Sequence, residues 1–412
     1  MKNNKNTHYS YSSIICNLLF LSIFVSLAFN YRINQDPSIF FSNVVILILL
    51  IMIFLYLLIN KKKIFISNYF IISIILILYS LIGIENASFF INFSKIAFII
   101  LNFYIFSLFF RSSNVDVKNM LLAYSLGLFI SIFYSTNYRD LTEIGYAQRL
   151  MVLDLGNYNV YGFLLSVSII SLLFLIKNSR SIILKIAFFL ISLQQLVILF
   201  TTFSRGGFLS LLVGIASFSY LFYKKSVKYF ILNTLLFILI FYIVVITVTI
   251  FNADVLVQRL FLLDDPTGSG RKQLYSFTLN KLFEYPLWLV WGTGLGSASF
   301  FKGFDFYVET AHNTYIDILI EFGLAWFSIF IFFLINTYKK INIIENSSDK
   351  NILKVIFIQI TFSFLYDSYY GATQIGWLLG LFFALFWNYS SHHSKLNNVN
   401  NQPMNPAPIK IP

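Results

Sequence analysis

Charge is scarce in this chain of 412 residues. Charged residues make up 11% of it, whereas hydrophobic residues make up 58% and phenylalanine alone occurs 49 times. A soluble domain of this length needs more polar surface than such a composition can offer to water. The composition therefore excludes a soluble globular protein, and it predicts an all-α fold in a polytopic integral membrane protein.

Cysteine and histidine are also rare. The single cysteine, Cys16, excludes an internal disulfide and a cysteine-based zinc site. Three of the four histidines lie near the termini (His8, His392 and His393), which leaves His312 as the only histidine in the interior of the sequence. One histidine among scattered carboxylates does not make a convincing metal site, so we expect neither a metal nor a cofactor.

Long apolar runs dominate the rest of the chain. A helix needs about 20 apolar residues to cross the ~30 Å hydrocarbon core of a bilayer. About twelve runs meet this need, at residues 13–31, 38–59, 64–84, 92–110, 119–135, 157–176, 182–202, 207–223, 229–251, 314–337, 352–367 and 373–389. No repeat or linker divides them, so we predict one transmembrane domain over residues 1–394. Residues 395–412 are rich in Asn and Pro, which predicts a disordered tail.

Basic residues set the expected orientation. They fall on alternate short loops: Lys61 to Lys63, Arg111 with Lys118, Lys177 to Lys185, Lys224 to Lys228, and Lys339 with Lys340. The positive-inside rule places these loops, both termini and the tail in the cytoplasm. The polar stretch at about 252–313 is then extracytoplasmic. We read the net charge of +12 as loop anchoring and expect no nucleic-acid partner.

The arginines do not follow the lysines. Six of the eight fall on the predicted outer side: Arg32, Arg139, Arg149, Arg205, Arg259 and Arg271. A guanidinium group binds phosphate oxygens through two parallel hydrogen bonds and keeps its charge in a low dielectric. These arginines therefore predict a phosphate-bearing substrate outside, although some of them could instead extend to lipid headgroups.

The outer stretch carries its own local pattern. After Arg271, apolar residues at Tyr275, Leu279 and Leu282 recur at helical spacing. They predict a short amphipathic helix that lies on the outer leaflet and ends at Pro286. Gly292 to Gly296 is expected to form a flexible corner, and His312 lies where the stretch meets the next apolar run.

Four segments, in this order and on this side, resemble the O-antigen polymerase and O-antigen ligase superfamily. They are SRGG at 204–207, GR at 270–271, GTGLG at 292–296 and HNTYIDILIEFGL at 312–324. The resemblance covers about residues 149–323. The chain departs from the usual pattern at 156–159, which lacks the proline often found between the asparagines, so the role of Arg149 stays open.

This resemblance implies a glycosyltransferase at the periplasmic face of the bacterial cytoplasmic (inner) membrane, using undecaprenyl-diphosphate-linked oligosaccharides. A polymerase would move the growing glycan onto a new lipid-linked repeat unit, and a ligase would move the finished glycan onto lipid A–core. The look of the HNTY segment favours the polymerase. A flippase or other transporter remains a further alternative because of the ionisable residues in or near apolar runs, namely Lys95, Asp317, Glu321 and Asp367.

Chemistry suggests a role for each candidate residue. Arg205 and Arg271 would stabilise the departing diphosphate without a metal. His312 would accept the proton of the attacking hydroxyl, which leads to inversion at the sugar. The expected substrate-binding residues are Arg149, Arg259, Asn313 and Tyr315. The expected partners are the lipid-linked oligosaccharide, membrane lipids and, as the resemblance allows, a chain-length regulator protein.

Overall fold

The computed structural model describes residues 5–29, 41–59, 72, 74–76, 78–79, 89–113, 115–135, 158–202, 204–223, 271–295, 311–367 and 376–400. Every regular element within these residues is an α-helix, which confirms the all-α prediction for them. The predicted span at 229–251 and most of the one at 64–84 lie outside the described residues. The total of twelve spans therefore stays a prediction.

The described helices follow the predicted apolar runs in order. They are α1 (Lys5–Ala28), α2 (Phe41–Ile59), α4 (Phe89–Ser112), α5 (Val117–Ser135), α6 (Tyr158–Asn178), α7 (Ile182–Thr201), α8 (Arg205–Tyr223), α10 (Arg271–Glu284), α11 (Pro286–Trp291), α12 (Thr314–Asn342), α13 (Ser347–Ser363) and α14 (Gly376–Asn400). By length and composition, six of them (in α2, α4, α6, α7, α8 and α12) could cross a membrane, and shorter apolar helices lie in α1, α5 and α14. α14 runs past Lys395 to Asn400, and the rest of the predicted tail lies outside the described residues.

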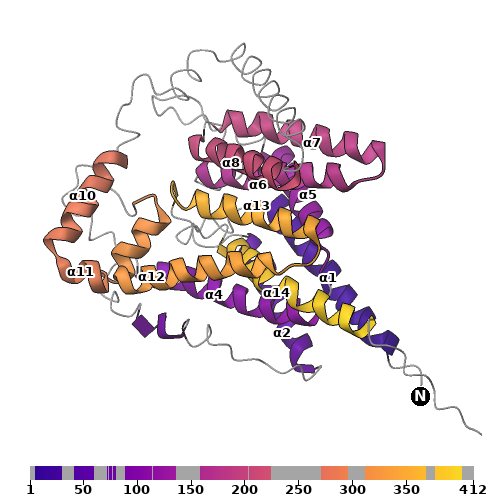
Figure 1. Ribbon diagram of the computed structural model, residues 1–412, viewed down its shortest axis with the longest axis horizontal. Coiled ribbons are helices and arrows are strands. Elements are labelled where there is room, and N and C mark those ends of the chain that lie inside the picture. Colours follow the sequence, from indigo (N-terminus) through magenta and orange to yellow (C-terminus); the bar gives the residue numbers. More distant parts are fainter. Residues whose placement is uncertain are drawn as a thin grey trace, which may run out of the picture.

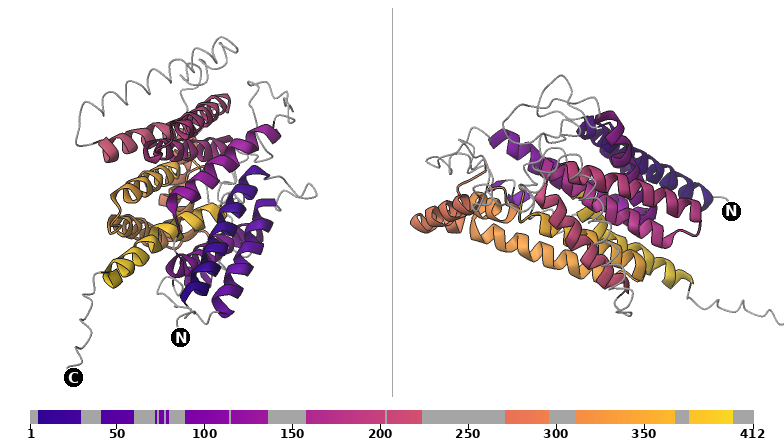
Figure 2. Two further views of the ribbon diagram at one scale, coloured as in Figure 1. Left: turned by 90° about the vertical axis from the view of Figure 1, so that its right-hand side faces the viewer. Right: turned by 90° about the horizontal axis from the view of Figure 1, so that it is seen from above.

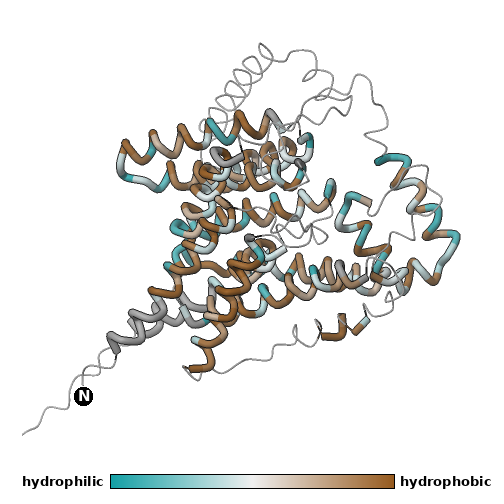
Figure 3. Tube along the Cα trace, turned by 180° about the vertical axis from the view of Figure 1, so that it is seen from behind, coloured by the Kyte–Doolittle hydropathy of each residue, from teal (hydrophilic) through white to brown (hydrophobic). Residues whose placement is uncertain are grey.

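Most of these helices run side by side in one bundle, while α10 and α11 project beyond its end (Figure 1). The N-terminal helices α1, α2 and α4 gather on one flank and α12 and α13 on another (Figure 2). α6 is buried along nearly its whole length and packs against α5, α7, α8 and α13. Apolar residues predominate along the bundle helices (Figure 3), as expected for helices surrounded by lipid and by one another.

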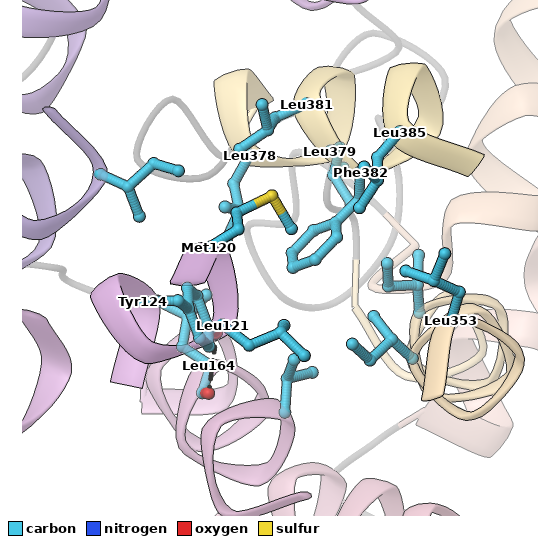
Figure 4. Packing of buried hydrophobic residues seen from close by; sticks show 14 of the residues in the cluster. Met120, Leu121, Tyr124, Leu164, Leu353, Leu378, Leu379, Leu381, Phe382 and Leu385 are labelled. Carbon is cyan, nitrogen blue, oxygen red and sulfur yellow. Dashed lines mark hydrogen bonds between the residues drawn. The ribbon is translucent and has the colours of Figure 1, made fainter. Parts of the chain in front are cut away.

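An apolar core joins α5, α6, α13 and α14. Met120, Leu121 and Tyr124 of α5 face Leu378 and Phe382 of α14 (Figure 4). The Tyr124 hydroxyl donates to the carbonyl oxygen of Leu164 in α6 over 2.8 Å, so this buried polar group is satisfied.

α6 and α8 approach each other closely because small residues line their contact. A Cβ added at Gly207 would lie 2.7 Å from the Cα of Gly162. One turn further along, the Ser166 hydroxyl donates to the Ser210 hydroxyl over 3.0 Å. Small residues with interhelical hydrogen bonds are the usual means by which membrane helices associate. The GG pair of the SRGG segment thus has a packing role.

α12 is broken at Gly323, whereas the sequence predicted one continuous span over 314–337. Gly323 has φ 71° and ψ −178°, so Thr314–Phe322 and the rest of α12 form two helices. The corner segment, Gly292 to Leu295, packs into this break. Thr293 donates from its backbone N–H (2.7 Å) and its hydroxyl (3.1 Å) to the carbonyl oxygen of Ile320, and the Gly294 N–H donates to that of Glu321 over 3.1 Å. The break was missed because hydropathy carries no information on φ and ψ.

Basic residues from the predicted cytoplasmic loops gather at one end of the bundle. The Nε of Arg111 donates to Asn388 over 2.7 Å. The Lys177 ammonium group lies 4.6 Å from the Tyr223 ring centroid at the C-terminal ends of α6 and α8. Arg205 begins α8 and so lies at the other end. This separation agrees with the predicted sidedness, although the side of the membrane that each end faces stays a prediction.

Candidate functional site

His312 has an unusual backbone. It lies two residues before the start of α12 with φ 51°, the only positive φ of a non-glycine residue within the described part of the chain. The left-handed region is unfavourable for residues with a Cβ. Such a conformation persists only where the surrounding structure holds it, and it is often found at functional sites.

Hydrogen bonds on both sides hold the His312 turn. Before it, the Ala311 N–H donates to the buried carboxylate of Asp317 over 2.6 Å. After it, the Asn313 side chain caps α12, because its Oδ1 accepts from the N–H groups of Tyr315 (3.0 Å) and Ile316 (3.2 Å). His312 therefore stands at the apex of a rigid turn.

The same turn is attached to the end of α13. The Thr314 N–H donates to the carbonyl oxygen of Phe364 over 2.8 Å, and its hydroxyl donates to that of Asp367 over 2.7 Å. The Asn313 Nδ2 donates to the Leu365 carbonyl oxygen over 3.0 Å. Residues 364–367, the turn that follows α13, thus form the floor on which the His312 turn rests.

The charge state of His312 depends on its neighbours. Its imidazole is exposed on one side, but the protein packed around the turn removes water, and this desolvation lowers its pKa. The carboxylate of Asp367 acts in the opposite sense and the charge of Arg271 lowers the pKa further. At neutral pH the imidazole is therefore neutral and able to accept a proton.

Arg271 approaches this turn as the first residue of α10. α10 packs on the first part of α12 through Leu274 and Leu282, which contact the cluster around Ala311 and Ile320. The sequence predicted a short amphipathic helix here, with Tyr275, Leu279 and Leu282 as its apolar residues on the outer leaflet. The helix is present, and in it Leu282 is buried, Tyr275 is half-buried and Leu279 is exposed.

Tyr275 turns instead toward the His312 turn. Burial raises the pKa of its hydroxyl, while a side-chain hydrogen bond with Asn313 and the charge of Arg271 lower it. Tyr275 therefore connects α10 to the residue that caps α12.

Pro286 also differs from its prediction. It does not merely end α10, because it occupies the first turn of α11. Proline suits that position, since its missing N–H would have no helical partner there.

The first turn of α8, which begins at Arg205, lies against the same floor. The Ser204 hydroxyl accepts from the Gly207 N–H over 3.0 Å and so caps α8, and it donates to Asn159 at the start of α6 over 3.0 Å. Gly206 packs against the ring of Tyr366, where an added Cβ would collide. The first turn of α8, which carries Arg205, and the turn that carries His312 thus both contact residues 364–367, although they are far apart in the sequence.

Two predicted substrate-binding residues have structural partners. The Asn313 side chain uses both its oxygen and its nitrogen within the turn. The Tyr315 hydroxyl donates to the Thr361 carbonyl oxygen over 2.8 Å, and its ring packs on Phe330 and Phe364. Their contact with substrate stays a prediction. Arg149 and Arg259 lie outside the described residues.

Two members of the site were not among the predicted site residues. Asp367 is buried and close enough to raise the pKa of His312, whereas the sequence indicates only an ionisable residue in an apolar run. Tyr275 was read as an apolar packing residue. A search for polar residues near helix ends would have found Asp367, because it follows the end of α13 at Ser363 by four residues. No pattern in the sequence pairs Tyr275 with Asn313.

Comparison with protein families finds a match to part of the chain. Residues 187–331 match the model of the family described as O-antigen ligase. The match contains Arg205, Arg271 and His312, whereas Asp367 lies beyond it. No curated protein matches the chain.

Proposed function

Residues 187–331 place the chain in the O-antigen polymerase and ligase superfamily, and on this premise we propose that it transfers a glycan from a polyprenyl diphosphate to a sugar hydroxyl at the outer face of the cytoplasmic membrane. The observation that carries the proposal is the closeness of Arg271 and His312, which is sufficient for the arginine to lower the pKa of the imidazole. A fixed cation beside a neutral base suits a reaction that releases an anion and consumes a hydroxyl proton.

The proposed reaction forms one glycosidic bond. The acceptor hydroxyl oxygen attacks the anomeric carbon of the donor sugar while the bond from that carbon to the diphosphate oxygen breaks. The hydroxyl proton passes to the free nitrogen of His312, and the bonding electrons leave with the diphosphate. Attack opposite the leaving group inverts the anomeric centre.

Charged residues would stabilise both charges that develop in this step. Arg271, with Arg205 across the 364–367 floor, would neutralise the negative charge that grows on the leaving diphosphate. The carboxylate of Asp367, which raises the pKa of His312, would stabilise the imidazolium ion once the proton has been taken.

Within this reaction class we propose polymerisation of lipid-linked repeat units. The ligase reaction, transfer to lipid A–core, is the second candidate, because the matched family is described as O-antigen ligase. Both reactions use the same donor chemistry and differ in the acceptor.

The test is reconstitution of the full chain in liposomes with lipid-linked repeat units. A ladder of longer glycans on the lipid supports the polymerase, and transfer only when lipid A–core is added supports the ligase. Movement of the lipid across the bilayer without a new glycosidic bond would contradict both and favour a transporter. A reporter fused near Thr267 should give an extracytoplasmic signal, and a cytoplasmic one would contradict the proposed sidedness.

A further inference from the structure

α10 and α11 carry large apolar side chains on their outward surface. Leu287 is 73% exposed, Phe283 69% and Trp291 58%, and Leu279 and Val290 are also exposed. Five large exposed apolar side chains on two short consecutive helices are unusual for a segment that faces only water.

The exposed apolar side chains of α10 lie on one flank of its second half. The inner face of α10, with Leu274 and Leu282, packs on α12. Of the outward residues, Leu279 and Phe283 are four apart and share one flank, whose first half carries the exposed Lys272 and Ser276. The other flank carries exposed polar residues only: Gln273, Asn280 and Glu284. The second half of α10 thus has one apolar and one polar flank, which suits the boundary between lipid and water.

The position of α11 agrees with that boundary. The carbonyl oxygen of Trp291 accepts a hydrogen bond from the Tyr79 hydroxyl, and the Tyr79 ring lies 5.7 Å from that of Trp326. The corner segment then enters the break at Gly323, after which α12 continues as an apolar helix. The end of α11 therefore lies near the start of the apolar part of α12, through their shared contacts with Tyr79, and Figure 1 shows α10 at a steep angle to α12.

Tryptophan and basic residues gather in the same place. Of the five tryptophans in the chain, Trp288, Trp291 and Trp326 lie here. Tryptophan is enriched where membranes meet water. The Lys281 ammonium group lies 5.3 Å from the Phe277 ring centroid and 6.0 Å from that of Trp288, so this cation also lies beside the aromatic surface. Its charge would favour anionic lipid headgroups.

We propose that α10 and α11 form a membrane-binding element whose partner is the lipid leaflet at the His312 end of the bundle. Leu279, Phe283, Leu287 and Trp291 lie among the acyl chains just below the headgroups. α10 then runs along the membrane surface, and its first residue, Arg271, lies at the depth of the headgroup phosphates. That last consequence, which puts Arg271 level with the diphosphate of a lipid-linked donor, rests on the proposed function.

Single cysteines test the proposal in the full chain. Cys16 is buried and is the only native cysteine, so a Cys16→Ser background allows one spin label at a time. The test pair is Phe283→Cys and Leu287→Cys, and the matched control pair on the polar flank is Gln273→Cys and Asn280→Cys. Each labelled protein is reconstituted in phosphatidylethanolamine–phosphatidylglycerol liposomes, and label collisions with oxygen and with a water-soluble nickel chelate are measured.

The test pair should collide mainly with oxygen, at a depth of about 5–10 Å, and the control pair mainly with nickel. Equal nickel access at both pairs would overturn the proposal. A test pair shielded from both reagents would also overturn it. If that shielding weakened at a low protein-to-lipid ratio, a second copy of the chain would be the partner that covers α10 and α11.

A second measurement avoids the cysteine background. Brominated lipids should quench the tryptophan fluorescence of the unmodified chain, and Trp291→Phe should lose part of that quenching. Unchanged quenching in this variant would likewise overturn the proposal. Neither readout involves glycan transfer, so failure of the proposed function would leave the result intact.

Discussion

Alanine at Gly323 should detach the corner segment from α12. With φ 71° and ψ −178°, Gly323 occupies a region of backbone space that is almost restricted to glycine. A Cβ there would also collide with the carbonyl oxygen of Val290 and lie 2.6 Å from the Gly292 nitrogen. Because both obstacles are backbone atoms, no rotation of a side chain can relieve the collision.

The expected loss of stability follows from two contributions. A residue with a Cβ in this region costs about 1–3 kcal/mol. Separation of the corner segment breaks the hydrogen bonds that Thr293 and Gly294 donate to Ile320 and Glu321, each worth about 0.5–1.5 kcal/mol. The sum for three bonds plus strain is about 2.5–7.5 kcal/mol, a large part of the ~5–15 kcal/mol that stabilises a typical domain.

Gly292 offers a sharper version of this test. It has φ 79° and ψ 174°, and a Cβ there would collide with the Glu321 carbonyl oxygen. Gly292→Ala should therefore separate the same two segments as Gly323→Ala. Once one substitution has separated them, the second should cost little, so the double variant should be almost as stable as either single variant.

The assay is thermal unfolding of the detergent-solubilised full chain at one fixed scan rate, with hydrogen exchange at the Thr293 and Gly294 amides. Gly376→Ala is the matched control, because a Cβ there meets only the side chain of Ile99, at 3.0 Å. A Gly323→Ala protein that melts with the wild type, or losses that add fully in the double variant, would refute the reasoning.

Four residues of the site give further predictions. His312→Ala and His312→Gly should both reduce transfer per folded molecule by about 10²–10⁴. The glycine variant should have a higher melting temperature than the alanine variant, because glycine tolerates φ 51°. A glycine variant that melts below the alanine variant would contradict this. Arg205→Lys and Arg271→Lys should each lose most activity, whereas Arg180→Lys should not, because Arg180 is exposed at the opposite end of the bundle. Normal amounts of polymer from the first two variants would exclude bidentate binding of the diphosphate by these arginines. Asp367→Asn should lower the pKa of His312 further, so activity should persist to lower pH than in the wild type; a pH profile that moves the other way would exclude the contact.

Hydropathy alone predicted most of the bundle. The run at 182–202 matches α7 (Ile182–Thr201), and the run at 119–135 matches α5 (Val117–Ser135). Such agreement is expected, because each membrane helix satisfies its own backbone hydrogen bonds and is therefore encoded by one continuous apolar run. The break at Gly323 could not be found in this way, because it depends on the corner segment, about thirty residues earlier in the chain.

The sequence indicated the residue types of the candidate site, whereas most of the contacts between these residues had no signal in it. Residue type and sidedness singled out Arg205, Arg271 and His312, because phosphate and proton transfer each require particular groups. The cap formed by Asn313 also had a signal, an asparagine directly before an apolar run. The hydrogen bond between Tyr275 and Asn313 had none, since it exists only once α10 packs on α12.

The backbone of His312 bears on why a histidine stands there. If this position served the fold alone, glycine would be the favourable residue, because it adopts φ 51° at no cost and the turn is held by the backbone of Ala311 and the side chains of Asn313 and Thr314. The imidazole itself makes no part of those hydrogen bonds. His312 is exposed, and its imidazole is neutral at neutral pH because desolvation lowers its pKa. The strained backbone at this rigid turn presents the imidazole and serves no hydrogen bond of the turn, which supports the proposal that His312 acts in the reaction.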